Sequence, residues 1–316
     1  MEVYTNLSDI KNIEPTAVAL GNFDGVHIGH QTLIAKAAET GRRNGLKTAV
    51  FTFTNHPANV ISGKTRVKNI MNFDEKVEAV SKYDVDYLFS VDFDDMMRTS
   101  SPLVFCRDIL SGILRARIAV CGFNYSFAYK AEGNPEVLAE YGKQFGYDTY
   151  VIDPVYVGGK IVSSTLIRQA ISEGRVDEYV RFTGRPYDIE GIVIHGKHLG
   201  HRIGFPTVNL ALSSEMAQPV NGVYVTKTYV NQYDGSYKVF PSVTNVGNKP
   251  TVGIFDKNAE THIFDFSEDI YGEKIKVEFI KLIRPEQKFE SIDELQEQIH
   301  CDCLYAQKYH TEIDHE

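Results

Sequence analysis

The chain has 316 residues, of which 43% are hydrophobic, and this length predicts about two domains with ordinary cores. A formal net charge of -9 argues against a nucleic-acid or anionic-membrane partner, although a site can still be locally basic. Met1–Tyr4 begins no signal peptide, no apolar run reaches the roughly 18 residues of a membrane span, and the cysteines are scattered, so we expect a soluble, reduced, cytoplasmic protein without a disulfide scaffold.

Strands and helices alternate over the first half of the chain. We predict strands at 16–20, 47–53, 86–91, 117–121 and 148–152, and helices at 31–38, 73–82, 101–114 and 135–145. Strands separated by helices indicate a parallel sheet with helices on both faces, in which ligands gather at the carboxyl ends of the strands. Two further helices, 166–173 and 176–182, stop before Gly184-Arg185-Pro186.

After Pro186 the pattern changes to strands separated by turn residues. We predict strands at 187–195, 208–210, 222–230, 237–246, 261–266 and 275–283, with a hairpin turn at 233–236. This pattern indicates an all-β unit, plausibly a small barrel. A last helix opens at Ser291, and five of its residues share one apolar face: Ile292, Leu295, Ile299, Cys303 and Ala306. We therefore place the domains at 1–183 and 184–316.

The stretch Gly21–His30, GNFDGVHIGH, lies between a buried strand and a helix. Backbone amides and the macrodipole at a helix N-terminus attract anions, and a spacing of three puts His27 and His30 on one side of the first turn. Gly25 and Gly29 leave room for a phosphate to approach the backbone. Two imidazoles aimed at one anion suit phosphorus chemistry, while histidines that only cap or pack are the plainer alternative.

Ser163-Ser164-Thr165 precedes a helical run and is by itself explained as an N-cap cluster. Arg168 lies one turn further on, close enough to share an anion with the cap. Hydroxyls, free amides and a guanidinium group that converge suit an ATP phosphate chain, and the histidine motif upstream favours this interpretation.

Phe123, Tyr125 and Phe127 alternate after a strand, so we expect their rings to share one face, with Asn124 turned the other way. The plainer interpretation is sheet core. The functional one is an aromatic wall for a flat heterocycle.

Gly191–His198 nearly spells a P-loop, but His198 replaces the required Ser or Thr and no helix follows, so we reject a P-loop. The glycines of this region remain candidates for a phosphate cradle of another geometry. His195, His198 and His201 are three apart, yet no Cys or acidic residue accompanies them, which argues against zinc. Cys301 and Cys303 diverge on the last helix, which argues against a metal there as well.

Thr207 and Asn209 point to the same face of an extended chain and present two oxygen ligands together. Hard oxygen donors and substrate phosphates are the usual ligands of Mg²⁺. Glu260, just before a strand, offers a carboxylate as general base for a hydroxyl acceptor. Taken alone, Glu260 would be a solvated carboxylate at a sheet edge.

Five segments in this order, GNFDGVHIGH, SSTLIR, GRPY, GFPTVNL and ETH, make the chain resemble the bacterial bifunctional riboflavin kinase/FAD synthetase family over essentially its whole length. The resemblance implies an N-terminal nucleotidyltransferase-type, Rossmann-like α/β domain that adenylylates FMN. It also implies a C-terminal six-stranded β-barrel that phosphorylates riboflavin. The expected reactions convert riboflavin and ATP to FMN and ADP, and then FMN and ATP to FAD and pyrophosphate, with Mg²⁺.

The resemblance also implies roles for single residues by motif match. His27 and His30 would stabilise the transition state at the α-phosphate, and Glu260 would take the proton of the riboflavin hydroxyl. Thr207 and Asn209 would hold Mg²⁺. The flavin would contact Asn124, Phe127 and Arg284. ATP would be bound by Gly21, Phe23, Gly29, Ser164, Thr165, Arg168, Gly196 and Gly204.

The chain departs from the usual family pattern at Asn55, Asn124, Ser126, Ala128 and His201, where Pro, Asp, Arg, Gly and Arg are common. These departures concern substrate affinity and the flavin pocket, whereas the phosphate-handling residues match. Two other functions stay open: a nucleotidyltransferase for another substrate whose barrel only sets specificity, and a non-catalytic flavin sensor. The oligomeric state, including a homo-oligomer, is also open.

Overall fold

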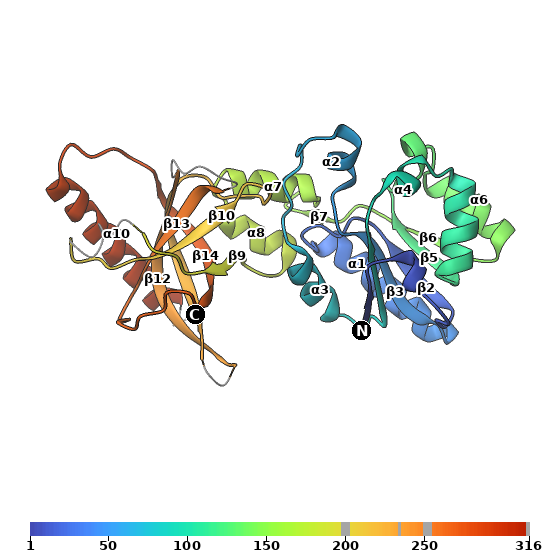
Figure 1. Ribbon diagram of the computed structural model, residues 1–316, viewed down its shortest axis with the longest axis horizontal. Coiled ribbons are helices and arrows are strands. Elements are labelled where there is room, and N and C mark those ends of the chain that lie inside the picture. Colours follow the sequence, from blue (N-terminus) through green and yellow to red (C-terminus); the bar gives the residue numbers. More distant parts are fainter. Residues whose placement is uncertain (197–202, 233–234, 249–254, 314–316) are drawn as a thin grey trace. The chain divides into compact units, whose positions relative to one another are not determined.

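The computed structural model describes residues 1–196, 203–232, 235–248 and 255–313 (Figure 1). It divides into two compact units, Met1–Ser164 and Thr165–Glu316, and each is described by itself. Helix α7, Ser164–Ser172, begins at the junction, and α8, Val176–Thr183, lies in the second unit. A domain boundary at 183/184 stays a prediction.

The first unit contains a six-stranded sheet with the order β1-β4-β3-β2-β5-β6 in which every neighbouring pair is parallel. The predicted parallel sheet is therefore confirmed. The sequence pattern did not reveal the short edge strand β1. The strands are β1 (Glu2–Tyr4), β2 (Thr16–Leu20), β3 (Lys47–Phe53), β4 (Tyr87–Val91), β5 (Ala116–Gly122) and β6 (Asp148–Ile152).

Strand β2 shows how the sheet is covered on both faces. All its residues are buried; Ala17 and Ala19 pack in one apolar cluster, and Val18 and Leu20 in the other. The first cluster includes residues of α1 (Ile28–Asn44) and α3 (Phe73–Ser81), and the second includes residues of α6 (Pro135–Phe145). The short elements are η1 (Leu7–Asp9), α2 (Pro57–Ser62), α4 (Asp95–Thr99), η3 (Tyr129–Ala131), β7 (Tyr156–Val157) and β8 (Lys160–Ile161).

The helix predicted at 101–114 is not a regular α-helix. A single turn, α5 (Pro102–Val104), leads into the π-helix η2 (Phe105–Ile113), in which Leu114 N–H donates to the carbonyl of Ile109, five residues back. Four side chains of η2 are buried: Phe105, Cys106, Ile109 and Leu110. Helix propensity does not distinguish a four-residue from a five-residue hydrogen bond, so the sequence could not reveal this.

The second unit is built on six antiparallel strands in the order β10-β13-β12-β11-β14-β9. A bridge between Ile194 and Asn209 brings the two ends of the sheet together, as expected of a small barrel. The strand predicted at 261–266 begins earlier, at Phe255, and ends at Ile263. The bounds are β9 (Tyr187–Ile192), β10 (Val208–Ser213), β11 (Gly222–Asn231), β12 (Tyr237–Asn248), β13 (Phe255–Ile263) and β14 (Lys274–Pro285).

One face of β11 and β12 carries buried hydroxyl groups that hydrogen-bond to one another across the strands. Thr226 contacts Ser242 and Thr244, each at 2.8 Å, and Thr244 contacts Thr261 at 2.9 Å. Pairing removes the cost of burying these polar groups. The other face packs against α10 (Ile292–Ile313) through Cys303 and Ala306, as predicted, whereas Ile292 is 59% exposed and does not join that face.

Gly142 of α6 offers a test of this packing. A Cβ atom at this position would lie 2.5 Å from the carbonyl oxygen of Tyr147. Alanine gains about 1 kcal/mol of helix propensity over glycine, but we expect the steric overlap to outweigh it, so that Gly142→Ala destabilises the first unit by about 1–2 kcal/mol. Thermal unfolding followed by circular dichroism measures this. The neighbouring exposed Lys143→Ala is the control, and an unchanged or higher melting temperature for Gly142→Ala contradicts the packing argument.

Candidate active sites

The turn between β2 and α1 places two histidines side by side. His27 is the N-cap of α1, and its Nδ1 accepts a hydrogen bond from the backbone N–H of His30 at 3.2 Å. The two rings stack with centroids 3.6 Å apart, and the ring of Phe23 lies 5.0 Å from that of His30. A Cβ at Gly29 would lie 3.2 Å from the His27 ring, so this glycine makes room for the histidine. The spacing therefore predicted the relative position of the imidazoles.

This turn has an unusual backbone. Phe23 and Val26 have φ of 46° and 36°, a region that L-residues rarely adopt, and Gly25 has φ of 84°. Such residues cost about 1–3 kcal/mol each unless their surroundings hold them. Gly25 adopts its conformation without strain, whereas Phe23 and Val26 need support from the rest of the fold.

Hydrogen bonds from distant segments supply this support. The Asp24 carboxylate accepts a hydrogen bond from the backbone N–H of Ile70 at 2.9 Å. The backbone carbonyl of Asp24 accepts one from the Ser164 hydroxyl, also at 2.9 Å. Gln31 donates to the Val26 carbonyl at 2.9 Å. Ser164 thus contacts the histidine motif directly. Gly21, Phe23 and Gly29 also belong to this turn. Thr165 and Arg168 continue α7 into the second unit, so their approach to the histidines stays a prediction.

A cavity of about 440 Å³ lies at the carboxyl ends of the parallel strands, where the fold class places ligands. Gly21 and Asn22 line it from the end of β2, and Phe53 from the end of β3. The stacked rings of Tyr125 and Phe127, with centroids 5.6 Å apart, line it as well. An aromatic wall beside the strand ends is the arrangement expected for a flat heterocycle.

Two residues of the aromatic prediction lie elsewhere. Phe123 is 42% exposed and lies apart from Tyr125 and Phe127, so the prediction of three rings on one face is wrong. The chain turns here, because Tyr125 N–H donates to the Gly122 carbonyl at 3.0 Å, and alternation holds only in an extended strand. Asn124 is exposed in this turn and does not line the cavity.

Of the departures from the family pattern, Ala128 and Ser126 line this cavity, whereas Asn55 does not. Ala128 has φ of 66° and ψ of -175°, a conformation that is essentially restricted to glycine, the residue that the family resemblance leads us to expect here. Asn55 accepts a hydrogen bond from the N–H of Phe93 at 2.8 Å. His201 lies outside the described residues.

In the second unit, a cavity of about 300 Å³ brings together residues from separate elements. Thr207, Glu260 and Arg284 all line it. Three of the four side chains predicted for this unit's site therefore lie around one cavity, and Asn209 is the fourth. His262 lines it too, and its Nδ1 lies 2.7 Å from the carbonyl oxygen of Pro206, next to Thr207. Ring nitrogen and carbonyl form a hydrogen bond when that nitrogen carries the proton.

Asn209 lies on β10 directly opposite Glu260 of β13, which in turn lies opposite Asn245 of β12. Residues directly opposite one another share a face of the sheet, so these three form a polar row. Asn209 is 3% exposed, and its Oδ1 accepts a hydrogen bond from Asn258 at 2.6 Å. A Cβ at Gly196 would lie 2.5 Å from the Asn209 amide nitrogen, so glycine is needed there.

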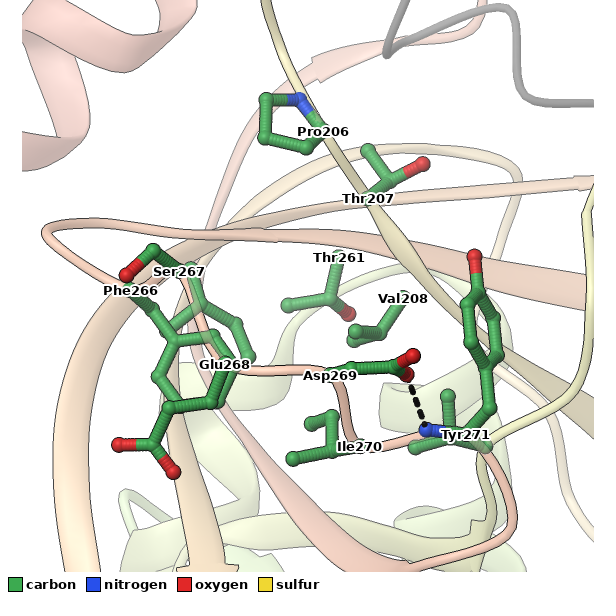
Figure 2. A pocket seen from close by; sticks show the side chains of 12 residues that line it. Pro206, Thr207, Val208, Thr261, Phe266, Ser267, Glu268, Asp269, Ile270 and Tyr271 are labelled. Atoms are coloured by element: carbon green, nitrogen blue, oxygen red, sulfur yellow. Dashed lines mark hydrogen bonds between the residues drawn. The ribbon is translucent and has the colours of Figure 1, made fainter.

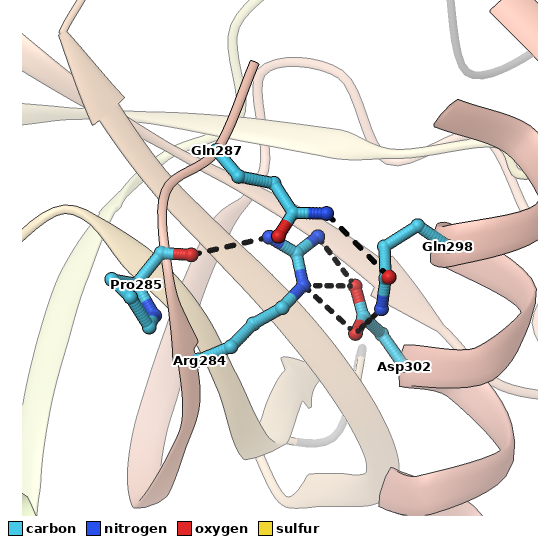
Figure 3. Close-up of polar contacts among 5 residues, drawn as sticks. All are labelled: Arg284, Pro285, Gln287, Gln298 and Asp302. Atoms are coloured by element: carbon cyan, nitrogen blue, oxygen red, sulfur yellow. Dashed lines mark hydrogen bonds and ion pairs between the residues drawn. The ribbon is translucent and has the colours of Figure 1, made fainter. Parts of the chain in front are cut away.

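Arg284 does not lie free over the cavity (Figure 3). Its guanidinium group donates to both carboxylate oxygens of Asp302 on α10, with Nη2 2.7 Å from Oδ2, and Gln298 also donates to Asp302 at 3.0 Å. The Asp302 side chain is 5% exposed. A bidentate, largely buried pair fixes the orientation of the guanidinium plane. The sequence offered no signal for Asp302 beyond its place on the last helix.

A second cavity in this unit, of about 760 Å³, lies on the other face of β13 (Figure 2). Thr261 and Val208 line it, and they alternate with Glu260 and Asn209 on their strands. Thr207 borders both cavities. The remaining wall includes the segment from Phe266 to Tyr271, in which Tyr271 N–H donates to Asp269 at 3.2 Å. Gly204, with φ of 85°, precedes Thr207 in the connection to β10.

The zinc and P-loop patterns of the sequence extend into residues outside the described part of the chain, which include Lys197, His198 and His201. The ring of His195 stacks on Tyr271 with centroids 3.9 Å apart. Within the described part of the chain, no group of three His, Cys, Asp or Glu side chains could hold a metal ion. On α10, Cys301 is exposed and Cys303 buried, so the two thiols diverge as predicted.

Comparison with known proteins places both units in families. Residues 9–166 match the FAD synthetase family, and residues 183–310 match the riboflavin kinase family. A bifunctional riboflavin kinase/FMN adenylyltransferase of Bacillus subtilis is 34% identical over 94% of this chain and 93% of its own length. The protein of the same name from Escherichia coli K12 is 34% identical over 94% of this chain and 93% of its own length. The chain belongs to the bifunctional riboflavin kinase/FMN adenylyltransferase family.

Members of this family carry two transferase activities, and the chain is accordingly an enzyme of flavin-cofactor biosynthesis with an FAD synthetase domain and a riboflavin kinase domain. These activities imply ATP as co-substrate. A crystal structure titled macrolide-efflux protein, from Streptococcus pneumoniae, has a TM-score of 0.86 and 31% identity over 97% of this chain and 98% of that chain. Among the residues described here, no helix combines the length and apolar character needed to cross a membrane.

The strained backbone at Ala128 gives a stability prediction for the FAD synthetase domain. Ala128→Gly removes a conformational cost of about 1–3 kcal/mol and adds about 0.5–1 kcal/mol of unfolded-state entropy, so we expect a net stabilisation of about 1 kcal/mol. Thermal unfolding measures it. Ala139→Gly, in the regular helix α6, is the matched control and should lose about 1 kcal/mol. A lower melting temperature for Ala128→Gly contradicts the strain.

Proposed function

We propose that the chain catalyses two ATP-dependent transfers at two separate sites, with FMN formed in the second unit and consumed in the first. The observation that carries this proposal is the presence of a phosphate-handling residue set in each unit, beside a cavity of suitable size. Domains 1–183 and 184–316, a cytoplasmic location and the roles of single residues below are parts of the same proposal.

At the first site, an oxygen of the FMN phosphate attacks the α-phosphorus of ATP, the bond to the β-phosphate oxygen breaks, and pyrophosphate leaves. Little covalent chemistry is required of the protein, so positioning and electrostatic stabilisation dominate. His27 and His30, stacked at the N-terminus of α1, suit the charge that develops on the α-phosphate. Gly21, Phe23, Gly29, Ser164, Thr165 and Arg168 would complete the ATP site.

The flavin of FMN would lie in the cavity beside Tyr125 and Phe127, because offset stacking on an aromatic face suits an isoalloxazine ring. Arg98 and Lys130 line the same cavity and offer positive charge for the FMN phosphate. Asn124, exposed in the neighbouring turn, would contact the flavin only at the margin.

At the second site, Glu260 would take the proton of the riboflavin 5′-hydroxyl group. The resulting oxygen nucleophile attacks the γ-phosphorus of ATP, the bond to the β-phosphate oxygen breaks, and ADP leaves. Riboflavin would occupy the 300 Å³ cavity beside Glu260 and Arg284, and ATP the 760 Å³ cavity. Thr207 supports this division because it borders both cavities. Gly196 and Gly204 would lie along the phosphates.

The oxygen atoms near Glu260 fit Mg²⁺. The Oδ1 of Asn209 has two lone pairs, of which the hydrogen bond from Asn258 uses one and so fixes the orientation of the other. Together with the Thr207 hydroxyl these are hard ligands of the kind that Mg²⁺ binds alongside phosphates. When bound, the ion would neutralise charge on the β- and γ-phosphates.

Exchanging one residue at each site tests the two-site proposal. His30→Ala should lower FMN adenylylation by roughly 10²–10³ and leave riboflavin phosphorylation intact, because one oriented donor is lost. Glu260→Gln should do the reverse. Chromatography of flavins formed from riboflavin or FMN with ATP and Mg²⁺ measures both. His300→Ala and Glu297→Gln, on the exposed part of α10, are matched controls. Loss of both activities in either variant would refute separate sites.

The ion pair between Arg284 and Asp302 gives a second functional prediction. Asp302→Asn keeps the shape of the side chain but removes the charge that holds the guanidinium group, so the flavin contact of Arg284 should be less well ordered. We expect KM for riboflavin to rise about 10-fold, equivalent to about 1.4 kcal/mol, with a smaller change in kcat. Steady-state kinetics measures this, with Asp293→Asn, exposed on α10, as control. An unchanged KM for riboflavin would show that the ion pair does not contribute to flavin binding.

A further inference from the structure

Lys76 of α3 is a buried cation that the mechanism above does not use. Only 7% of the residue is exposed. Its Nζ donates to the carbonyl of Phe53 at 2.8 Å and to the carbonyl of Asn22 at 3.3 Å. Phe53 is the last residue of β3, and Asn22 follows the end of the neighbouring strand β2. The ammonium group therefore joins the carboxyl ends of two adjacent parallel strands.

Asn22 opens the strained turn that carries the histidines. Its carbonyl also accepts a hydrogen bond from the buried hydroxyl of Thr52 at 2.8 Å, so two side chains hold this one oxygen. The next residue, Phe23, already has φ of 46°. A carbonyl held from two sides fixes the peptide plane from which this conformation starts, and hence the direction in which the turn leads to His27.

The segment before α3 is tied to the same turn in the opposite direction. The Asp24 carboxylate accepts from the N–H groups of Ile70 and Met71, at 2.9 and 3.4 Å. Lys76 thus reaches from α3 to the turn, and Asp24 reaches from the turn to the residues that lead into α3. Two such contacts of opposite direction leave the turn little freedom to shift relative to the helix.

The lysine is expensive to bury. Desolvation lowers the pKa of its ammonium group to about 8, while the carboxylate of Asp24 acts in the opposite direction. An apolar side chain would fill the same space without this cost, although it would leave the two carbonyls without the donor.

We propose that Lys76 is a positioning residue for adenylyl transfer, whose ammonium group holds the Asn22 and Phe53 carbonyls and thereby keeps His27 and His30 in the geometry of the reaction. The inference rests on the proposed function of the first unit. Lys76 acts through the backbone of the turn and needs no contact with substrate. The charged form gives the stronger hydrogen bonds to carbonyl oxygens, so loss of its proton loosens the turn.

The titratable groups near Lys76 are Asp24, from the turn, and His56, which lines the same small cavity from the start of α2. Desolvation lowers the pKa of the lysine to about 8, which places its loss of charge near this pH. Lys76 is protonated below this pH, so adenylylation should decline as pH rises through about 8.

The experiment compares Lys76→Met, the isosteric Thr52→Val and, as control, Lys82→Met at the exposed C-terminus of the same helix. For each, kcat and KM for FMN adenylylation are measured from pH 6.5 to 9.5, with riboflavin phosphorylation in the same preparation and the melting temperature. We expect kcat of Lys76→Met to fall roughly 10–100-fold with little change in KM, and the decline near pH 8 to disappear. Thr52→Val should fall about 3–10-fold and keep the decline.

Three results would overturn the inference: an unchanged kcat in Lys76→Met, an equal fall of both activities, or a wild-type profile without a decline near pH 8. The last is measured without any variant, so it decides the matter even if Lys76→Met does not fold. Failure of the wild-type protein to form FAD from FMN would instead refute the proposed function of the first unit.

Discussion

The turn from Asn22 to His27 is the constraint on which the proposed chemistry of the first unit depends. Two of its residues occupy backbone conformations that L-residues disfavour, and the turn persists because Asp24, Thr52 and Lys76 tie it to neighbouring segments. Contacts with distant segments, rather than local propensity, offset the conformational free energy of these residues. As a result, two imidazole rings are stacked at a helix N-terminus, and in the proposed mechanism this arrangement lowers the reorganisation that the reaction requires.

In the second unit, the β-sheet fixes the positions of the polar side chains. Antiparallel register sets Asn209, Glu260 and Asn245 in a row across three strands, and alternation along β13 places a cavity on either side. Strands held by ladder hydrogen bonds are rigid supports for such a row. A carboxylate that would be an ordinary edge residue in isolation thereby becomes part of a polar site.

The second unit buries several polar groups together with their hydrogen-bond partners. The hydroxyl cluster of Thr226, Ser242 and Thr244 and the pair of Arg284 with Asp302 each satisfy groups that would be costly if left alone. Breaking one partner is therefore more damaging than the net energy of the contact suggests.

The sequence alone determined the alternation of strands and helices, the change to an all-β unit after Pro186, the order of the motifs and the neighbouring positions of His27 and His30. These follow from periods of two and 3.6 residues and from spacing within one turn, which are local properties. Only the tertiary structure decided that Phe123 turns away from Tyr125, that η2 is a π-helix, and that Lys76, Asn245 and Asp302 adjoin Asn22, Glu260 and Arg284. Each of these depends on a local turn or on partners brought together from 15 to 54 residues away, and periodicity along the sequence does not encode such pairings.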